Sequence, residues 1–251
     1  MGIAEALAIA LAGFAAGTIN TVVGSGTLIT FPVLLAFGYA PVTANVSNTI
    51  GLVPGSLSGA FGYRRELAGQ AVRVRRLGTV SLLGGVTGAA LLLVLPASAF
   101  EAIVPAFIAI ALALVVLQPR LASALAHRTP GREHGGHAVT LLALFATGVY
   151  GGYFGAAQGI LLLAILGLAL AQDLHRTNAL KNVLAGLVNG VAGLFFVVAA
   201  HVAWGPAAII ALGSILGGQV GARYGRRLHP TALRGLIVVV GLVAIARLVA
   251  F

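Results

Sequence analysis

Long apolar stretches without a charged residue alternate along the chain with short stretches rich in arginine. Residues 6–63, 138–172 and 182–222 contain no Asp, Glu, Lys or Arg. A membrane-spanning helix needs about 20 apolar residues, so each stretch is long enough for two or three passes. Solid apolar blocks such as Leu91–Leu95 lack the period-two alternation of a membrane β-strand. The pattern predicts an all-α polytopic membrane protein.

Glycine, proline and charge divide these stretches into shorter apolar segments. The segments at 25–39 and 158–171 are shorter than a full span, so we expect each to be a re-entrant or broken helix paired with the segment before it. Whether they span or re-enter is left open, which gives about 8–10 transmembrane or re-entrant helices. The expected segments are 3–23, 25–39, 43–62, 77–96, 99–117, 138–156, 158–171, 177–199, 204–222 and 235–250.

The composition agrees with insertion into a lipid bilayer. Hydrophobic residues make up 59% of the 251 residues and charged residues only 8%, whereas a soluble domain carries about 25% charged residues. The absence of Cys excludes disulfides and thiolate chemistry. The formal charge is +10, but no basic run is interleaved with aromatic residues, so we expect no nucleic-acid partner.

The positions of the arginines predict which side of the membrane each loop faces. Short loops rich in Lys and Arg face the cytoplasm, so we place the loops at 64–76, 120–132 and 223–234 inside and the uncharged connections at 39–42, 96–100 and 201–205 outside. The order of basic and uncharged loops is reversed in the second half of the chain. This reversal predicts two inverted-topology repeats.

Weak self-similarity supports the same division. Gly17 and Gly24 match Gly148 and Gly155 at an offset of 131 residues, and Asn45 matches Asn178 at an offset of 133. The expected organisation is a first transmembrane repeat over 1–117, a cytoplasmic linker over 118–137 and a second transmembrane repeat over 138–251. Inverted repeats with short segments at corresponding places are typical of secondary transporters whose site lies near the midplane.

Polar and small residues interrupt the apolar run at 17–27. Irregular backbone at membrane depth is tolerated only against protein or a wet cavity, and N–H groups that open the next short helix attract an anion. Close helix packing through small residues is the alternative, although it does not explain Asn20. The candidate binding residues of this stretch are Asn20, Thr21, Gly24, Ser25 and Gly26.

A second polar stretch, at 43–48, contributes Asn45 and Asn48 as candidates. Asn is a good N-cap, so the alternative is that Asn45 only starts a helix. The corresponding stretch in the second half contributes Asn178, Lys181 and Asn182. Their spacing places these three side chains on one face of a helix.

Lys181 is the one lysine among 15 basic residues. An ionisable residue that enters an apolar segment suggests a functional site, and an ammonium would supply a compact positive charge for an anion. The alternative is an interfacial cation that snorkels to the cytoplasmic headgroups. Gln158, at the start of the second short segment, is a further candidate, whereas Tyr150 and Tyr153 fit packing better.

Enzyme chemistry finds no support in the sequence. No His or carboxylate cluster has metal-ligand spacing, and residues 24–26 lack the Lys and the spacing of a phosphate-binding loop. We expect no catalytic residue, metal or cofactor. No Asp or Glu lies in the middle of an apolar segment, so we also expect no carboxylate proton relay.

The polar stretches resemble the two repeats of the sulfite exporter TauE/SafE family. The first resemblance is carried by AGTINTVVGSGT at 16–27 and PVTANVSN at 41–48, and the second by residues 148–159 and RTNALKN at 176–182. Ser25 stands where the family often has Gly, which leaves the backbone argument intact. The resemblance implies a multi-pass protein of the bacterial inner membrane that exports sulfite or an organosulfonate such as sulfoacetate.

The leading hypothesis is therefore an alternating-access exporter of a small anion that uses the membrane potential. Its expected partners are the small anionic substrate and the lipid bilayer, and a homo-oligomer is left open. The alternatives are a transporter of another small metabolite, and a non-transporting membrane scaffold or accessory subunit.

Overall fold

The computed structural model describes residues 1–126, 137–170, 172–225 and 230–250. These residues form ten helices and no strand, which confirms the all-α prediction. The helices are α1 (Ile3–Val22), α2 (Thr27–Ala36), α3 (Pro41–Gly62), α4 (Ala71–Val94), α5 (Ala97–Ala126), α6 (His137–Tyr153), α7 (Gln158–Ala169), α8 (Leu174–Ala199), α9 (Trp204–Tyr224) and α10 (Pro230–Ala250).

The lengths of the helices fit a membrane protein with several crossings. Among the described residues, α1, α4, α8, α9 and the part of α5 over Ala97–Arg120 are long and apolar enough to cross a membrane. The two short helices, α2 with 10 residues and α7 with 12, rise only about 15–18 Å. Each therefore reaches about half-way through a hydrocarbon core of roughly 30 Å.

Several helices extend beyond the predicted apolar segments. α4 begins at Ala71, so Arg73, Arg75 and Arg76 lie in its first turns and the prediction of a loop there is wrong. α5 continues to Ala126, into the predicted 118–137 linker. The reason is that a helix continues past the hydrocarbon boundary where the residues are good helix formers, and arginine is one. Linker residues 127–136, with Arg128 and Arg132, and the basic residues Arg226 and Arg227 lie outside the described residues, while His137 begins α6.

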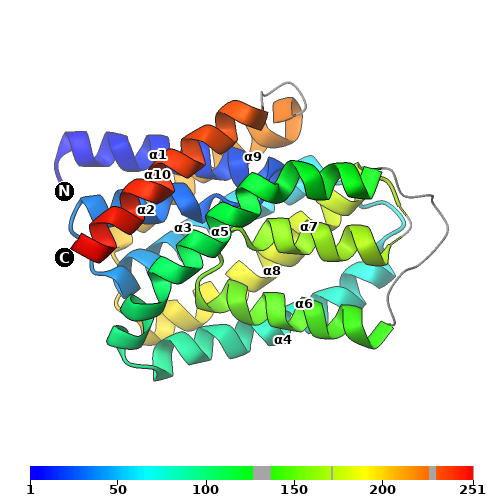
Figure 1. The fold of residues 1–251 in the computed structure, drawn as a ribbon, viewed down its shortest axis with the longest axis horizontal. Coiled ribbons are helices and arrows are strands. Elements are labelled where there is room, and N and C mark those ends of the chain that lie inside the picture. Colours follow the sequence, from blue (N-terminus) through cyan, green and yellow to red (C-terminus); the bar gives the residue numbers. More distant parts are fainter. Residues whose placement is uncertain (127–136, 171, 226–229, 251) are drawn as a thin grey trace.

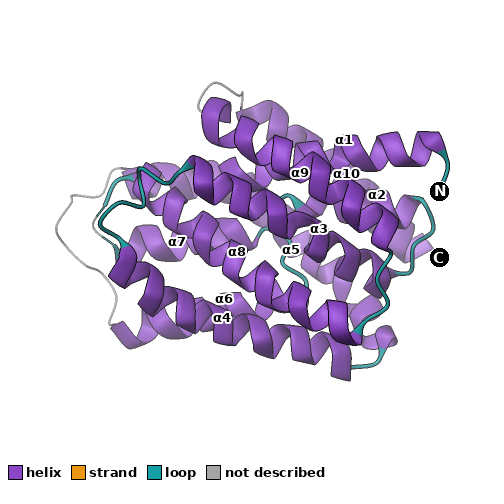
Figure 2. Cartoon of the chain, turned by 180° about the vertical axis from the view of Figure 1, so that it is seen from behind, coloured by secondary structure: helices purple, strands orange, loops and turns teal. Residues whose placement is uncertain are grey.

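One end of the bundle holds both chain termini (Figures 1 and 2). At this end the hydroxyl of Tyr39, just after α2, donates to Glu5 Oε1 in the first turn of α1 at 2.8 Å. The N–H of Ala203, just before α9, donates to Ser47 Oγ near the start of α3 at 2.9 Å. The α1/α2 hairpin therefore begins and ends at the same end of the bundle.

The opposite end gathers the arginine-rich turns. Arg176 Nη2 donates to Ala68 O at 3.0 Å, and Arg73 Nη1 donates to Gln172 Oε1 at 3.0 Å. His137 at the start of α6 and Leu170 after α7 line one cavity there. The α6/α7 hairpin therefore enters the bundle from the end opposite to the α1/α2 hairpin.

The two halves of the chain interleave. α1 packs mainly against α9, and α6 against α4; α3 packs against α9, and α8 against α4. If each helix is replaced by the helix five places before or after it in the chain, the α1–α9 pair becomes the α6–α4 pair and the α3–α9 pair becomes the α8–α4 pair. α3 and α8, which correspond in the same way, contact each other. This is the packing expected of two related halves, while the division at 117 and 138 and the inverted topology stay predictions.

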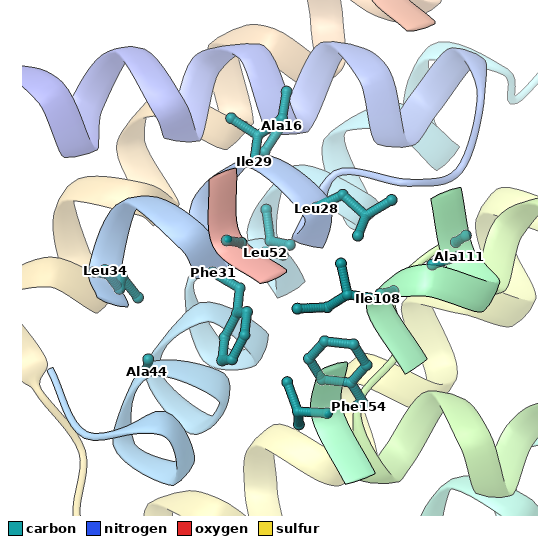
Figure 3. Close-up of a cluster of buried hydrophobic side chains, with 14 of the residues drawn as sticks. Ala16, Leu28, Ile29, Phe31, Leu34, Ala44, Leu52, Ile108, Ala111 and Phe154 are labelled. Atoms are coloured by element: carbon teal, nitrogen blue, oxygen red, sulfur yellow. The ribbon is translucent and has the colours of Figure 1, made fainter. Parts of the chain in front are cut away.

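The short helix α2 lies among apolar side chains from several other helices (Figure 3). Leu28, Ile29 and Phe31 of α2 are buried together with Ala16 of α1 and Ile108 of α5. Phe31 also meets Phe154, which follows α6, with ring centroids 5.2 Å apart in an edge-to-face arrangement. The first turns of the half-length helix are thus held inside the bundle by apolar contacts with α1, α5 and the turn after α6.

The two ends of the bundle make opposite predictions for labelling from outside the cell. The chain has no native Cys, so Ala68→Cys and Ser98→Cys are each a single-cysteine protein, and both positions are exposed. We expect a membrane-impermeant maleimide to label Ser98→Cys in intact cells and Ala68→Cys only after permeabilisation. Labelling of both from the same side would contradict the assigned sidedness.

Candidate functional site

The two hairpins meet tip to tip in the middle of the bundle. α1 ends at Val22 and α6 at Tyr153, and the turn after each contains a glycine with positive φ, Gly24 at +92° and Gly155 at +75°. The N–H of Gly159 donates to Gly24 O at 3.0 Å. The N-terminal ends of α2 and α7 therefore face each other at the crossing, which supports the sequence match of Gly24 with Gly155.

Close packing requires the glycines of the first hairpin tip. A Cβ on Gly24 would overlap the Cα of Gly159, and a Cβ on Gly26 would lie 2.5 Å from Ala16 O. The alternative that small residues here allow close helix packing is thus confirmed for Gly24 and Gly26. In the second tip Ala157, which is fully buried, has φ +58°, and a non-glycine residue in the left-handed region is a strain typical of functional sites.

One face of α8 supplies donors to the C-terminal end of α1. Lys181 Nζ donates to Asn20 O at 3.0 Å and to Thr21 O at 3.2 Å. Asn178 Nδ2 and Asn182 Nδ2 also donate to Thr21 O, at 3.2 Å and 3.4 Å. The prediction that these three side chains share one helix face is confirmed. They donate hydrogen bonds to carbonyls that the end of α1 leaves without an intrahelical partner.

Lys181 lies inside the bundle, with only 1% of its surface exposed. The snorkelling alternative is therefore wrong, because the ammonium points to the hairpin tip and not to the cytoplasmic surface. In the part of the chain that the structure describes, the ammonium has no carboxylate partner, and two of its three N–H groups are used by α1. A positive charge at the C-terminus of α1 also interacts favourably with the helix dipole.

Asn45 performs on α6 the task that Asn178 performs on α1. Asn45, within α3, is fully buried, and its Nδ2 donates to Tyr153 O at 2.9 Å. The alternative that Asn45 is an N-cap is wrong, since α3 begins at Pro41 with Ala40 as its N-cap. The sequence match of Asn45 with Asn178 thus corresponds to a shared structural role: each amide binds the last carbonyls of the other half's first helix.

The two halves differ one turn further along. Asn48 occupies the position in α3 that Lys181 occupies in α8, but its side chain binds within its own half. Asn48 Oδ1 accepts a short hydrogen bond from the Thr30 hydroxyl, and Asn48 Nδ2 donates to Thr27 Oγ1 at 3.3 Å. The positive charge is therefore present on one side of the crossing only.

Several polar atoms at the crossing are buried without a hydrogen-bond partner among the described residues. They are Ser25 Oγ, Asn45 Oδ1, Gln158 Nε2, Asn178 Oδ1 and the Tyr153 hydroxyl. A buried polar group without a partner is costly, and in native proteins it often marks a place for a water or a ligand. The predicted candidates Ser25, Gln158 and Asn178 therefore each carry a buried donor or acceptor without a partner among the described residues.

Thr21 and Asn20, two predicted site residues of α1, bind α8 through their backbone carbonyls, whereas the sequence suggested their side chains. The Thr21 hydroxyl donates to Gly17 O within α1 at 2.9 Å, so Thr21 offers the site its carbonyl and not its hydroxyl. Asn20 is half-buried, and its Nδ2 donates to Ser56 Oγ of α3 at 3.4 Å. The hydrogen bonds from α8 to these two residues go to their backbone carbonyls.

A cavity of about 170 Å³ reaches the crossing from the arginine-rich end. Asn178 forms part of its wall together with Val22, Tyr63, Gln118, Leu163, Leu174, His175 and Gly225. Sequence analysis did not point to Tyr63 or Gln118, because both lie outside the polar stretches of the apolar segments and only the folded bundle brings them to Asn178. An anion could approach the hairpin tips through this cavity from the predicted cytoplasmic side.

Aromatic side chains fill the bundle on the other side of the crossing. Phe100, near the start of α5, contacts Tyr153 and Phe154 with ring centroids 5.6 Å and 5.9 Å apart. Phe107 packs against the same two rings at 6.1 Å and 6.2 Å. Since α5 begins at the end that holds the chain termini, this cluster separates the crossing from that end.

Comparison with known proteins identifies the family. The family model of the sulfite exporter TauE/SafE matches residues 9–248. The chain belongs to the sulfite exporter TauE/SafE family. This confirms the resemblance seen in the polar stretches. Together with the apolar helices, the family identifies a multi-pass bacterial membrane protein of a membrane transporter family.

Curated relatives of this TauE/SafE protein match it over nearly their whole length. A "Probable membrane transporter protein ORF9" of a Sinorhizobium species is 31% identical over 244 residues, 96% of this chain and 90% of the relative. The "Probable membrane transporter protein YfcA" of Escherichia coli K12 is 26% identical over 237 residues, 93% of this chain and 85% of the relative. No solved structure matches the chain significantly.

The hairpin crossing should tolerate no side chain at Gly24. Gly24→Ala adds a Cβ that overlaps Gly159 and also strains a positive φ, whereas Gly38→Ala adds a Cβ at φ +85° with nothing within 4 Å. We expect Gly38→Ala to cost about 1 kcal/mol of backbone strain and Gly24→Ala at least roughly 2 kcal/mol more from overpacking. Thermal unfolding in one detergent compares them, and equal melting temperatures would contradict the close crossing.

Proposed function

We propose that the chain exports a small anion, sulfite or an organosulfonate such as sulfoacetate, and binds it where the two hairpin tips cross. The observation that carries this proposal is Lys181, an ammonium in the middle of the bundle without a carboxylate partner among the described residues. An unpaired buried cation is costly unless something neutralises it. A transported anion would do so.

The groups at the two hairpin tips fit an anion better than a cation. The N-termini of α2 and α7 meet at the crossing, and each carries the positive end of a helix dipole. Gln158 Nε2 is a donor without a described partner. A lysine suits a small tetrahedral or pyramidal anion because it does not impose the bidentate geometry of arginine. The sulfur chemistry of the substrate is taken from the family.

The position of the carboxylates supports transport driven by the membrane potential. Glu5 and Glu101 lie at the termini end of the bundle, while Glu66 and Asp173 lie at the arginine-rich end. Expelling a monoanion from an inside-negative cell gains roughly 2.3 kcal/mol per 100 mV. This corresponds to about a forty-fold concentration ratio, so uniport is sufficient for export.

The cavity and the aromatic cluster fit one state of an alternating-access cycle. The crossing is reached through the cavity at the arginine-rich end and is covered by Phe100, Phe107 and their neighbours toward the other end. Export then requires the aromatic cluster to open and the cavity beside Asn178 to close. The interleaved halves allow this by movement of one hairpin with the helices that enclose it.

Flux of radiolabelled sulfite into or out of proteoliposomes under an imposed potential tests the proposal. We expect flux that follows the potential and that sulfoacetate blocks, with sulfate as a second competitor. Absence of flux above empty liposomes from a folded protein would contradict sulfite as substrate and favour another metabolite or a scaffold role. Uphill transport driven by a proton gradient alone would contradict uniport.

Replacing Lys181 tests whether its charge serves substrate binding in addition to holding α1. Lys181→Met removes the charge and both bonds to α1, whereas Ser214→Ala removes a buried hydroxyl bond, 2.9 Å long, from α9 to Gly51 O of α3. We expect both variants to lower the melting temperature. Only Lys181→Met should raise the half-saturating substrate concentration, by roughly 10- to 100-fold, because it weakens substrate binding. Unchanged substrate affinity in Lys181→Met would leave Lys181 with a structural role only.

A further inference from the structure

A second cavity, of about 160 Å³, lies at the arginine-rich end of the bundle and away from the hairpin crossing. It is bounded by the first turns of α4 and α6 and by the end of α7. Its polar and charged lining residues are Arg73 and Arg76 of α4 and His137 and Thr140 of α6. We propose that this cavity binds the phosphate headgroup of an anionic phospholipid.

The α4 wall of the cavity carries positive charge that no carboxylate of the described residues neutralises. Arg73 and Arg76 both line it, and in the described part of the chain neither guanidinium forms an ion pair with a carboxylate. Arg73 Nη1 donates to Gln172 Oε1 at 3.0 Å, which fixes the side chain beside the cavity. Arginine is well suited to a phosphate because its planar fork can bind two of the phosphate oxygens.

Two helices begin at the cavity wall and add to the attraction. α4 starts at Ala71 and α6 at His137, so the unpaired N–H groups and positive dipole ends of both helices lie at the same place. His137 and Thr140 provide further hydrogen-bonding side chains on α6. The arginines and the two helix ends are independent observations that point to a single negatively charged group.

The rest of the cavity is apolar and opens beside surface that faces lipid. Leu77, Leu141 and Leu170 form part of its lining. On the adjoining surface of α6, Val139 and Leu142 are 67% and 68% exposed. α4 and α6 lie along the edge of the bundle (Figures 1 and 2). Exposed apolar side chains next to a basic cavity suit a ligand that has both a phosphate and acyl chains.

Binding of the purified protein to phosphatidylglycerol, with phosphatidylcholine as the zwitterionic reference, tests this assignment. The double variant Arg73→Gln/Arg76→Gln removes the two charges of the cavity. The matched control Arg65→Gln/Arg75→Gln removes two exposed arginines from the same end of the bundle that do not line the cavity. Native mass spectrometry of lipid adducts gives the affinities.

We expect the native protein to prefer phosphatidylglycerol and the cavity variant to bind it roughly 10- to 30-fold more weakly, while the control keeps its affinity. An equal loss in the control would show that diffuse surface charge attracts the lipid and would overturn the proposal. Binding of glycerol phosphate as tight as that of the lipid would also overturn it, because the site would then take a soluble anion. Neither outcome depends on sulfite flux, so this test and the transport test can fail separately.

Discussion

The structure depends on satisfying the last backbone carbonyls of two helices that end inside the bundle. α1 stops at Val22 and α6 at Tyr153, where the chain turns back into a short helix, so the last carbonyls of both helices have no intrahelical partner. Leaving such a carbonyl unpaired costs about 1–3 kcal/mol. Side chains of α8 and α3 remove this cost, Asn178 and Lys181 for α1 and Asn45 for α6.

This requirement explains the composition of the two central helices. α3 and α8 contact each other and each contacts a hairpin tip, so their polar faces are turned inward and their apolar faces outward. α3 is as long as the spanning helices but does not appear among the helices apolar enough to cross a membrane. Its buried Asn45, Ser47 and Asn48 are the reason. A low hydropathy here reflects a role in the core and not a position in water.

The same groups link the fold to the proposed transport. Lys181 holds the end of α1 and also supplies the positive charge of the crossing, while Asn48 at the corresponding position binds only within its own half. In the proposed cycle, an anion that drew the ammonium away from Asn20 and Thr21 would weaken the attachment of the α1/α2 hairpin. Substrate binding and hairpin position would then be thermodynamically coupled. The asymmetry between the halves follows from one substitution within a repeated framework.

The sequence by itself determined the all-α membrane class, the two short helices, the common face of Asn178, Lys181 and Asn182, and the family. These follow from local properties, namely the length of apolar runs, the helical period and short motifs. It also paired Asn45 with Asn178, whose equivalent bonds the structure confirms. It placed the start of α4 too late, because apolarity marks the hydrocarbon boundary and not the end of a helix.

Only the tertiary structure decided what these side chains bind. Lys181 and its carbonyl partner at Asn20 are 161 residues apart in the chain, and no local pattern distinguishes an ammonium that holds a distant helix end from one that snorkels to the surface. The same holds for Gly24 and Gly159, which are glycines because two hairpins from different halves cross there. Contacts between segments so far apart are fixed by the packing of all the helices together, and the sequence of either segment alone does not contain them.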